Sequence, residues 1–252
     1  MATRRVLVRS LLAVGGVLLV AGCGSNDVDA APVEKKAFPV SGQSLTIDSD
    51  NSDIVLVPAD VRDVEVSRQV DGWVIIGEGP ETVWKMEGGT LTLRVKCEGL
   101  VGNCDARHEI KVPRGLAVTV KDDNGNITAD GFTQALKVTT DNGDVSVRNA
   151  RGPLDLVTDN GTIRVEGASS TAVTARSDNG DIRLALTGAP NRLESFSDNG
   201  AVTVEVPGGV SYAVDARTDN GGLDVGVRTD RNSPRTLKAH SENGDVTVRA
   251  VN

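Results

Sequence analysis

The sequence predicts an all-β protein, specifically a single-domain β-solenoid of stacked rungs of about 18–23 residues with an irregular N-terminal β portion. Three observations predict this fold. An acid followed by Asn-Gly recurs along the chain, apolar residues alternate on both sides of each copy, and one copy alone is too small to fold. Outside the N-terminal 22 residues, no stretch shows a convincing helical period.

The first observation is the repeat itself. Seven copies recur at intervals of 18, 18, 19, 20, 21 and 23 residues, and an eighth lies upstream at Asp50, with Ser52 in place of the glycine. Repeats at a fixed short period are typical of solenoids. The seven copies begin at Asp123 and Asn124, Asp141 and Asn142, Asp159 and Asn160, Asp178 and Asn179, Asp198 and Asn199, Asp219 and Asn220, and Glu242 and Asn243.

The second observation is the pattern that flanks each copy. Apolar residues stand five positions before the acid and four and six positions after it, and the residue just before the acid is Ser or Thr in every copy except Asp122. A spacing of two indicates strands with one buried face. Asn-Gly is a strong turn signal because both residues tolerate positive φ. Each copy therefore predicts a strand, a corner and a second strand.

The third observation is the size of one copy. Ordering about 18 residues costs more conformational free energy than burial of four or five aliphatic side chains returns. Independent hairpins are therefore excluded, and the copies must stack so that each covers its neighbour. The second corner of each rung varies in length and composition, which makes that edge a candidate for a binding surface.

The chain divides into three parts. Residues 1–22 are a predicted signal peptide, residues 23–37 a flexible tether, and residues 38–252 the β domain, irregular over 38–122 and regular over 123–252. The first strand pair obeys the repeat consensus, which favours one continuous domain. A boundary between two domains near Asp122 remains an alternative.

The N-terminus has the features of an export signal. Arg4, Arg5 and Arg9 precede an apolar run from Leu11 to Val20, which is too short to span a bilayer and fits a signal peptide. The run ends in Val-Ala-Gly before Cys23, which resembles the lipobox of bacterial lipoproteins. This resemblance implies cleavage before Cys23 and acylation of its thiol. We therefore expect a protein anchored by lipid, including palmitate, at the extracytoplasmic face of the cell membrane.

The export route and the partners are less constrained. Paired arginines near the N-terminus fit either the general or the twin-arginine route. Removal of residues 1–22 changes the formal charge from −8 to −11. An acidic domain without a basic cluster argues against nucleic acid as a partner. A cell-wall, glycan or protein partner remains open.

Two further cysteines, Cys97 and Cys104, lie close together in the irregular portion. Export would place them in an oxidising compartment, where we predict a disulfide. The loop is small, so the bond should contribute only about 2–2.5 kcal/mol.

One stretch, "IKVPRGLAVTVKDDNGNITADG" followed by repeated Asp-Asn-Gly corners, resembles the bacterial family of putative adhesin domains, a family of unknown function. The resemblance covers residues 40–250 approximately. It implies a β-solenoid protein of the cell envelope and brings no catalytic residues.

The repeated polar residues suggest structural roles first. Stacking would align the aspartates in a column about 4.8 Å apart, where we expect each carboxylate to accept a backbone N–H of its own turn. Calcium is an alternative ligand of such a column, although the repeat differs from calcium-binding β-roll repeats. The asparagines are expected to form a stacked amide ladder, with sugar binding as the alternative.

The sequence contains no nucleophile elbow, phosphate-binding loop or zinc spacing, and only two histidines. We therefore expect a non-enzymatic protein, without a cofactor, that presents an adhesion or envelope-scaffold surface. Two alternatives remain: an accessory protein in envelope-stress sensing, and a carbohydrate-active β-helix enzyme.

Overall fold

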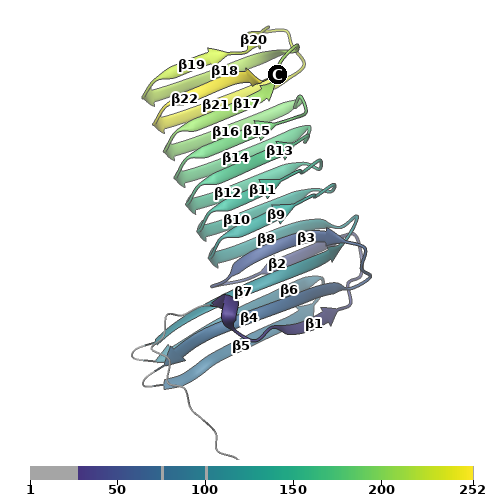
Figure 1. The fold of residues 1–252 in the computed structure, drawn as a ribbon. Coiled ribbons are helices and arrows are strands. Elements are labelled where there is room, and N and C mark those ends of the chain that lie inside the picture. The colour runs from purple at the N-terminus through teal and green to yellow at the C-terminus, as the bar shows by residue number, and fades with distance from the viewer. Residues whose placement is uncertain (1–27, 75–76, 100–101, 252) are drawn as a thin grey trace, which may run out of the picture.

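The structure, a computed structural model, describes residues 28–74, 77–99 and 102–251. The predicted signal peptide and Cys23 lie outside these residues. The described chain forms two β-sheets of 11 strands each, which face one another along the length of the molecule (Figure 1). The predicted β-solenoid is therefore confirmed. Within the described residues, no helix has the length and apolar character needed to cross a membrane.

The strands of each sheet follow a regular spatial order. Sheet A runs β1 (Glu34–Phe38), β4 (Val64–Val74), β7 (Gly102–Pro113), β3 (Asp53–Ala59), β9 (Ile127–Asp130), β11 (Val145–Arg148), β13 (Ile163–Ala168), β15 (Ile182–Leu186), β17 (Val202–Pro207), β22 (Val246–Val251) and β19 (Leu223–Gly226). Sheet B runs β20 (Arg228–Thr229), β18 (Ser211–Asn220), β21 (Thr236–Asn243), β16 (Arg192–Asn199), β14 (Ala172–Asn179), β12 (Leu154–Asn160), β10 (Leu136–Asn142), β8 (Ala117–Asn124), β2 (Ser44–Asp48), β6 (Thr90–Gly99) and β5 (Gly77–Glu87).

Alternation of side chains explains why each rung forms two strands. In β12, Leu154, Leu156 and Thr158 point inward and are at most 3% exposed, whereas Asp155 and Val157 between them face outward. After the Asn-Gly corner the chain enters sheet A, where Ile163 and Val165 are 0% exposed. The core is thus a double layer of aliphatic side chains between the sheets.

The corner sets the register of stacking. Neighbouring regular rungs pair in parallel, for example Leu136 with Leu154 and Asn142 with Asn160. A Cβ added at Gly161 would lie 2.1 Å from the carbonyl oxygen of Gly143 in the neighbouring rung. Glycine is therefore needed at this position because the backbones of successive corners almost touch.

The upstream copy of the repeat forms the first rung. Strand β2 pairs with β8 and β3 pairs with β9, while Asn51 forms a bridge with Asn124. The intervening chain leaves the solenoid as β4–β7 and extends both sheets with antiparallel pairs, β4 with β7 and β5 with β6. A single buried core runs from Phe38 to Val248 across residue 122.

The predicted tether needs a correction. Residues 28–38 lie against the solenoid rather than extending freely, because β1 pairs antiparallel with β4. A short 3-10 helix, Val28–Ala30 (η1), is held by Arg107, which pairs with Asp29 at 2.6 Å, and by the side-chain amide of Gln69. The composition of this segment is polar, so the alternation that marks the other strands is absent from it.

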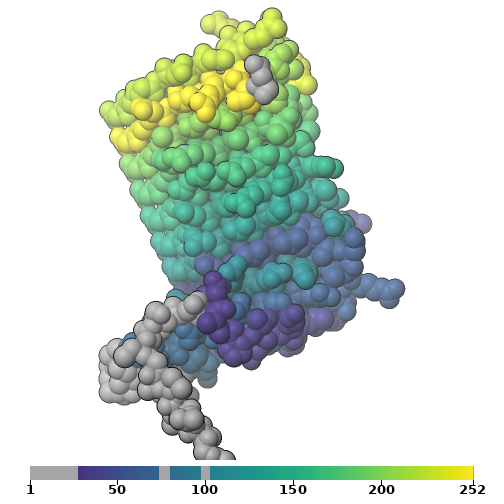
Figure 2. All heavy atoms as spheres, viewed as in Figure 1, coloured from purple at the N-terminus to yellow at the C-terminus, as the bar shows by residue number. Residues whose placement is uncertain are grey.

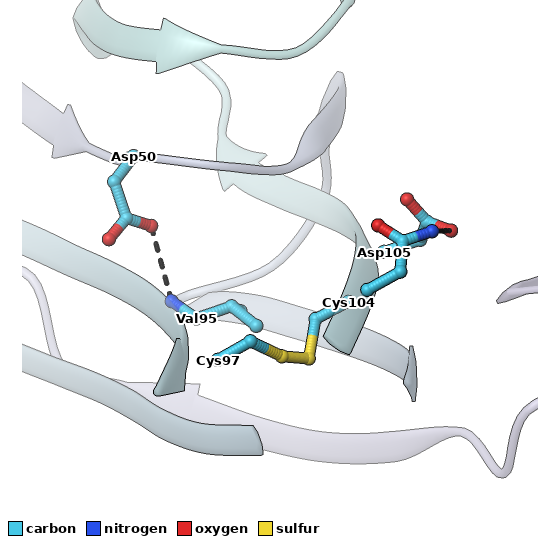
Figure 3. The surroundings of a disulfide bond; sticks show 6 residues. Asp50, Val95, Cys97, Cys104 and Asp105 are labelled. Atoms are coloured by element: carbon cyan, nitrogen blue, oxygen red, sulfur yellow. Dashed lines mark hydrogen bonds between the residues drawn. A yellow bond between two sulfur atoms is a disulfide. The ribbon is translucent and has the colours of Figure 1, made fainter. Parts of the chain in front are cut away.

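The predicted disulfide between Cys97 and Cys104 is confirmed (Figure 3). It joins β6 of sheet B to β7 of sheet A and thus ties the two sheets together in the N-terminal extension. Gly72 packs against it, since a Cβ there would lie 2.6 Å from Cys104 Sγ. Nearby, Asp50 Oδ1 accepts the backbone N–H of Val95 at 3.1 Å.

The rungs do not stack entirely in chain order. The last rung of the sequence, β21 and β22, lies between the rung of β16 and β17 and the rung of β18 and β19. After β17 the chain leaves room for one rung and forms the outermost rung with β18 and β19. It then returns through residues 227–235 and fills the space with β21 and β22. Rung β18–β19 therefore forms the end of the solenoid, at the top of Figures 1 and 2.

Candidate binding surface

The asparagines of the corners form a continuous ladder of side-chain amides. Each Nδ2 donates to the Oδ1 of the next asparagine toward the N-terminal end. The bonds are Asn124 to Asn51 (3.0 Å), Asn142 to Asn124 (2.9 Å), Asn160 to Asn142 (3.0 Å), Asn179 to Asn160 (3.0 Å), Asn199 to Asn179 (3.0 Å), Asn243 to Asn199 (3.1 Å) and Asn220 to Asn243 (3.1 Å). Because these amides pair with one another, the ladder is a structural element.

A second column runs inside the ladder. Where Ser or Thr precedes the acid it is buried, except in the end rung, where Thr218 is partly exposed. In five rungs its hydroxyl donates to the carbonyl of the corner glycine in the adjacent rung, whereas Thr140 Oγ1 has no hydrogen-bond partner among the described residues. These bonds are Thr158 to Gly143 (3.0 Å), Ser177 to Gly161 (2.9 Å), Ser197 to Gly180 (2.9 Å), Ser241 to Gly200 (2.8 Å) and Thr218 to Gly244 (2.7 Å). Ser or Thr therefore recurs at this position of the repeat because its hydroxyl supplies a hydrogen-bond donor to the neighbouring rung.

The predicted role of the first acid holds for one corner, where Asp50 Oδ1 accepts the backbone N–H of Asn51 at 2.8 Å, and is wrong for the seven Asn-Gly corners. Within the described residues, no carboxylate among Asp123, Asp141, Asp159, Asp178, Asp198, Asp219 and Glu242 accepts a backbone N–H of its own turn. The residue after the glycine accepts one from the next rung instead, as Asp144 does from Thr162 (2.8 Å) and Asp181 from Ala201 (2.9 Å). The reason is strand alternation, which turns the first acid outward and leaves the later one at the corner.

The outward acids therefore remain exposed or form ion pairs on the surface of sheet B. Arg176 lies 3.4 Å from Asp178 and 3.8 Å from Asp198, and His240 lies 3.8 Å from Asp219. Among the described residues, no group of three or more His, Cys, Asp or Glu side chains is arranged to hold a metal ion.

Asp122 occupies the hydroxyl column in place of Ser or Thr and is 4% exposed. Its Oδ2 would lie 3.1 Å from a Cβ at Gly125, as Ser177 Oγ would from one at Gly180. Burial raises the pKa of Asp122 from 3.8 to about 7, the Ser49 hydroxyl opposes this, and the charges of Asp123, Asp50 and Asp53 add to it. Burial thus makes this carboxyl harder to ionise than an exposed aspartate.

A distinct set of side chains lies on the outer face of sheet B. Arg176, Phe196, His240 and Arg217 are in register on four neighbouring strands, β14, β16, β21 and β18. The Arg176 guanidinium lies 4.8 Å from the Phe196 ring centre, and Phe196 meets His240 edge to face at 4.8 Å. We call these four residues the planar row, because each ends in a flat group.

A hollow of about 340 Å³ lies beside the planar row. Its other wall is formed by Glu194, Lys238 and Asp215. Glu194 pairs with Arg192 at 2.9 Å and with Lys238 at 3.1 Å, and these contacts lower its pKa. The volume falls at the small end of the range for ligand pockets, and the walls combine an aromatic ring with donors and acceptors.

The planar row was missed in the sequence analysis, although the aligned repeat contained a signal for it. Two positions before each acid, the residues are Lys121, Thr139, Val157, Arg176, Phe196, Arg217 and His240. Side chains that end in a flat group (Arg, Phe and His) are confined to the later copies. Alternation places this position on the outer face, so its variation marks a surface rather than the core.

Comparison with known proteins agrees with this geometry. The model of the Toastrack DUF4097 family matches residues 115–251, more than half of the chain. The chain belongs to the Toastrack DUF4097 family. The Toastrack match covers the regular rungs and the planar row, whereas the first rung and the N-terminal extension lie outside it. No curated protein matches the chain.

One solved structure shows the same fold, and a second is similar over most of its length. A protein from Bacteroides fragilis named a putative adhesin aligns with a TM-score of 0.51 at 14% identity, over 87% of this chain and 97% of that one. A second putative adhesin, from Parabacteroides distasonis, aligns with a TM-score of 0.48 at 12% identity, over 87% and 98% of the two chains. The first likeness shows the fold alone.

The amide ladder leads to a testable asymmetry between two asparagines. In Asn160→Asp, the side chain loses its donor to Asn142 and places a carboxylate against the Asn142 oxygen, so we expect a loss of about 1–2 kcal/mol in urea unfolding. Asn51 only accepts in the ladder, so Asn51→Asp should change the stability by less than half as much. Equal losses in the two variants would contradict a directional ladder.

Asp122 predicts a pH dependence of stability. Its pKa is raised in the folded state, so its contribution is complete below about pH 4 and is lost as the pH rises toward 7. Asp122→Ser restores the hydroxyl of the repeat and should stabilise the protein by about 1–3 kcal/mol at pH 8. At pH 4.5 the gain should be much smaller. A gain of the same size at both pH values in urea unfolding would exclude the titration of Asp122 as its cause.

Proposed function

We propose that this Toastrack protein is a non-catalytic lipoprotein, held at the extracytoplasmic face of the cell membrane by lipid on Cys23, that binds a glycan through the outer face of sheet B. The glycan belongs to the cell wall or to the surface of a neighbouring cell. In this role the solenoid is a rigid support that presents the planar row as an adhesion site.

The sequence supports the anchor. A positively charged N-terminus, a short apolar run and small residues before Cys23 are the features that precede lipid attachment. The described chain begins beside β4 and β7, at one end of the solenoid (Figure 1), whereas the planar row lies on rungs near the other end. An anchor at the N-terminus would therefore place the binding face on the rungs farthest from the anchored end.

The planar row is the observation that carries the proposal. Of the six aromatic residues in the chain, Phe38, Phe132 and Tyr212 are buried, and Trp84 packs against the core. Phe196 instead lies half-buried in a polar hollow on the outer face. An aromatic ring beside Glu194, Lys238 and Arg217 offers an apolar contact for the C–H face of a sugar together with donors and acceptors for its hydroxyls.

The same hollow favours binding over catalysis. Glu194 is its best-placed carboxylate, and its ion pairs with Arg192 and Lys238 hold it in the charged form. A general acid for glycoside cleavage needs a raised pKa. Glu194 therefore suits the acceptance of a sugar hydroxyl rather than the donation of a proton.

The anchor is tested by labelling cells with radioactive palmitate. We expect the wild-type chain to take up label and fractionate with membranes, and Cys23→Ser to do neither. Cys97→Ser/Cys104→Ser serves as the control, because it removes two other thiols and should leave the label in place. Equal labelling of wild type and Cys23→Ser would contradict the anchor.

The binding face is tested with a panel of glycans and peptidoglycan fragments on the full chain. Phe196→Ala should weaken binding to the best glycan about tenfold, which corresponds to about 1.4 kcal/mol. Trp73→Ala is the matched control, since Trp73 is also an exposed aromatic, at 46%, but lies in the N-terminal extension. Failure of every glycan to bind, or equal losses in both variants, would contradict the proposed site.

A further inference from the structure

The end rung of the solenoid exposes residues that every other rung buries. In β19, Leu223 is 51% exposed and Val225 is 37% exposed. The residues at the position of Leu223 in the other rungs are Ile54, Ile127, Val145, Ile163, Ile182, Val202 and Val246, and each is 0% exposed. The residues at the position of Val225 are at most 1% exposed.

This rung has the sequence of an internal rung. It keeps the apolar alternation, the Thr before the acid and the Asn-Gly corner. On one side, β18 pairs with β21 and β19 with β22. On the other side, β20 covers Ser211 and Tyr212, and among the described residues no strand pairs there with the segment Ala213–Asn220 or with β19. These two segments are therefore open sheet edges. We call these two segments the open end.

The opposite end of the solenoid is protected. Its edge strand in sheet A, β1, carries Glu34, Lys35 and Lys36, and its edge strand in sheet B, β5, contains Pro80 and Lys85. Charged residues and proline on edge strands prevent further strand pairing. The two ends therefore differ. The edge strands β1 and β5 prevent a second copy from pairing its own strands with the N-terminal end.

We propose that the open end is covered by the open end of a second copy of this chain. A two-fold axis perpendicular to the sheets reverses the strand direction and the stacking direction together. It places β18 antiparallel to β18 of the copy and β19 antiparallel to β19 of the copy, so both sheets continue through the junction. Leu223 and Val225 then lie in one apolar core shared by the two copies.

The charges on β18 complement themselves under this symmetry. In the junction, side chains that point to one face of the sheet must lie opposite side chains of the copy that point to the same face. Antiparallel registers centred on Ala216, Arg217 or Thr218 meet this condition. In the register centred on Ala216, Arg217 of each copy lies opposite Asp215 of the other. In the register centred on Thr218, Arg217 of each copy lies opposite Asp219 of the other. The Arg217 and Asp215 side chains have no ion pair with other described residues. A centre at Arg217 would oppose like charges and is disfavoured.

The junction would also join the binding faces of the two copies. The planar row and its hollow lie on the four rungs nearest the open end. In the dimer, the hollow on sheet B meets the hollow of the copy on the same continuous face. The self-association itself does not depend on the glycan or on the lipid anchor.

The test is the mass of the full chain in detergent micelles, by sedimentation or light scattering at about 50 µM, where a micromolar contact is populated. We expect a dimer. Leu223→Asp places a charge in the shared core and should raise the dissociation constant at least tenfold. Val83→Asp is the matched control, because Val83 is also an exposed apolar residue, at 45%, but lies on β5 at the protected end.

Charge reversal identifies the register. Arg217→Asp should weaken the dimer, and either Asp215→Arg or Asp219→Arg added to it should restore the dimer, according to the register. Circular dichroism checks that each variant is folded. A wild-type monomer at this concentration, or equal effects of Leu223→Asp and Val83→Asp, would overturn the proposal. Phe196→Ala should remain dimeric, so failure of glycan binding and failure of dimerisation are distinguishable.

Discussion

Between neighbouring rungs, the carbonyl oxygen of one corner glycine lies 2.0–2.3 Å from the place that a Cβ on the next glycine would occupy, from Gly143 through Gly161, Gly180, Gly200 and Gly244 to Gly221. This close approach requires glycine at each corner, and the backbone hydrogen bonds from each corner glycine to the next rung fix the register of the rungs. Since the apolar positions stand at fixed distances from the glycine, the register at the corner also aligns the core. The loops at the second corner can then vary in length without disturbing the stack.

The hydrogen bonds of the corner give the stack a direction. The Asn amides, and the Ser or Thr hydroxyls of five rungs, donate toward the N-terminal end, whereas the backbone N–H groups of the corner glycines donate toward the outer end. At Asp122, burial raises the pKa of the carboxyl to about 7. The N-terminal end of the stack is closed by the extension from β4 to β7.

The repeat predicted the strands, the corners and the buried positions because each depends on local spacing, and the disulfide was predicted separately from export and the short separation of Cys97 and Cys104. The order of the last two rungs could not be predicted, since the copies at Asp219 and Glu242 have equivalent patterns and either fits either place. The role of the first acid was misassigned because Asp before Asn-Gly fits both an outward strand position and a turn acceptor. Phe196 was overlooked because the repeat pattern is defined by the residues that the copies share, whereas a binding face depends on the positions at which the copies differ.

The central claim is that the corners form one rigid column rather than a row of independent turns. Amide hydrogen exchange of the corner glycines tests it most directly. The N–H groups of Gly143, Gly161 and Gly180 donate to Asn160, Asn179 and Asn199 of the next rungs at 3.0, 3.1 and 2.9 Å, although the corners border solvent. The account predicts that these amides exchange as slowly as those of the core strands, through global unfolding. Exchange at the rate of exposed turns would contradict it.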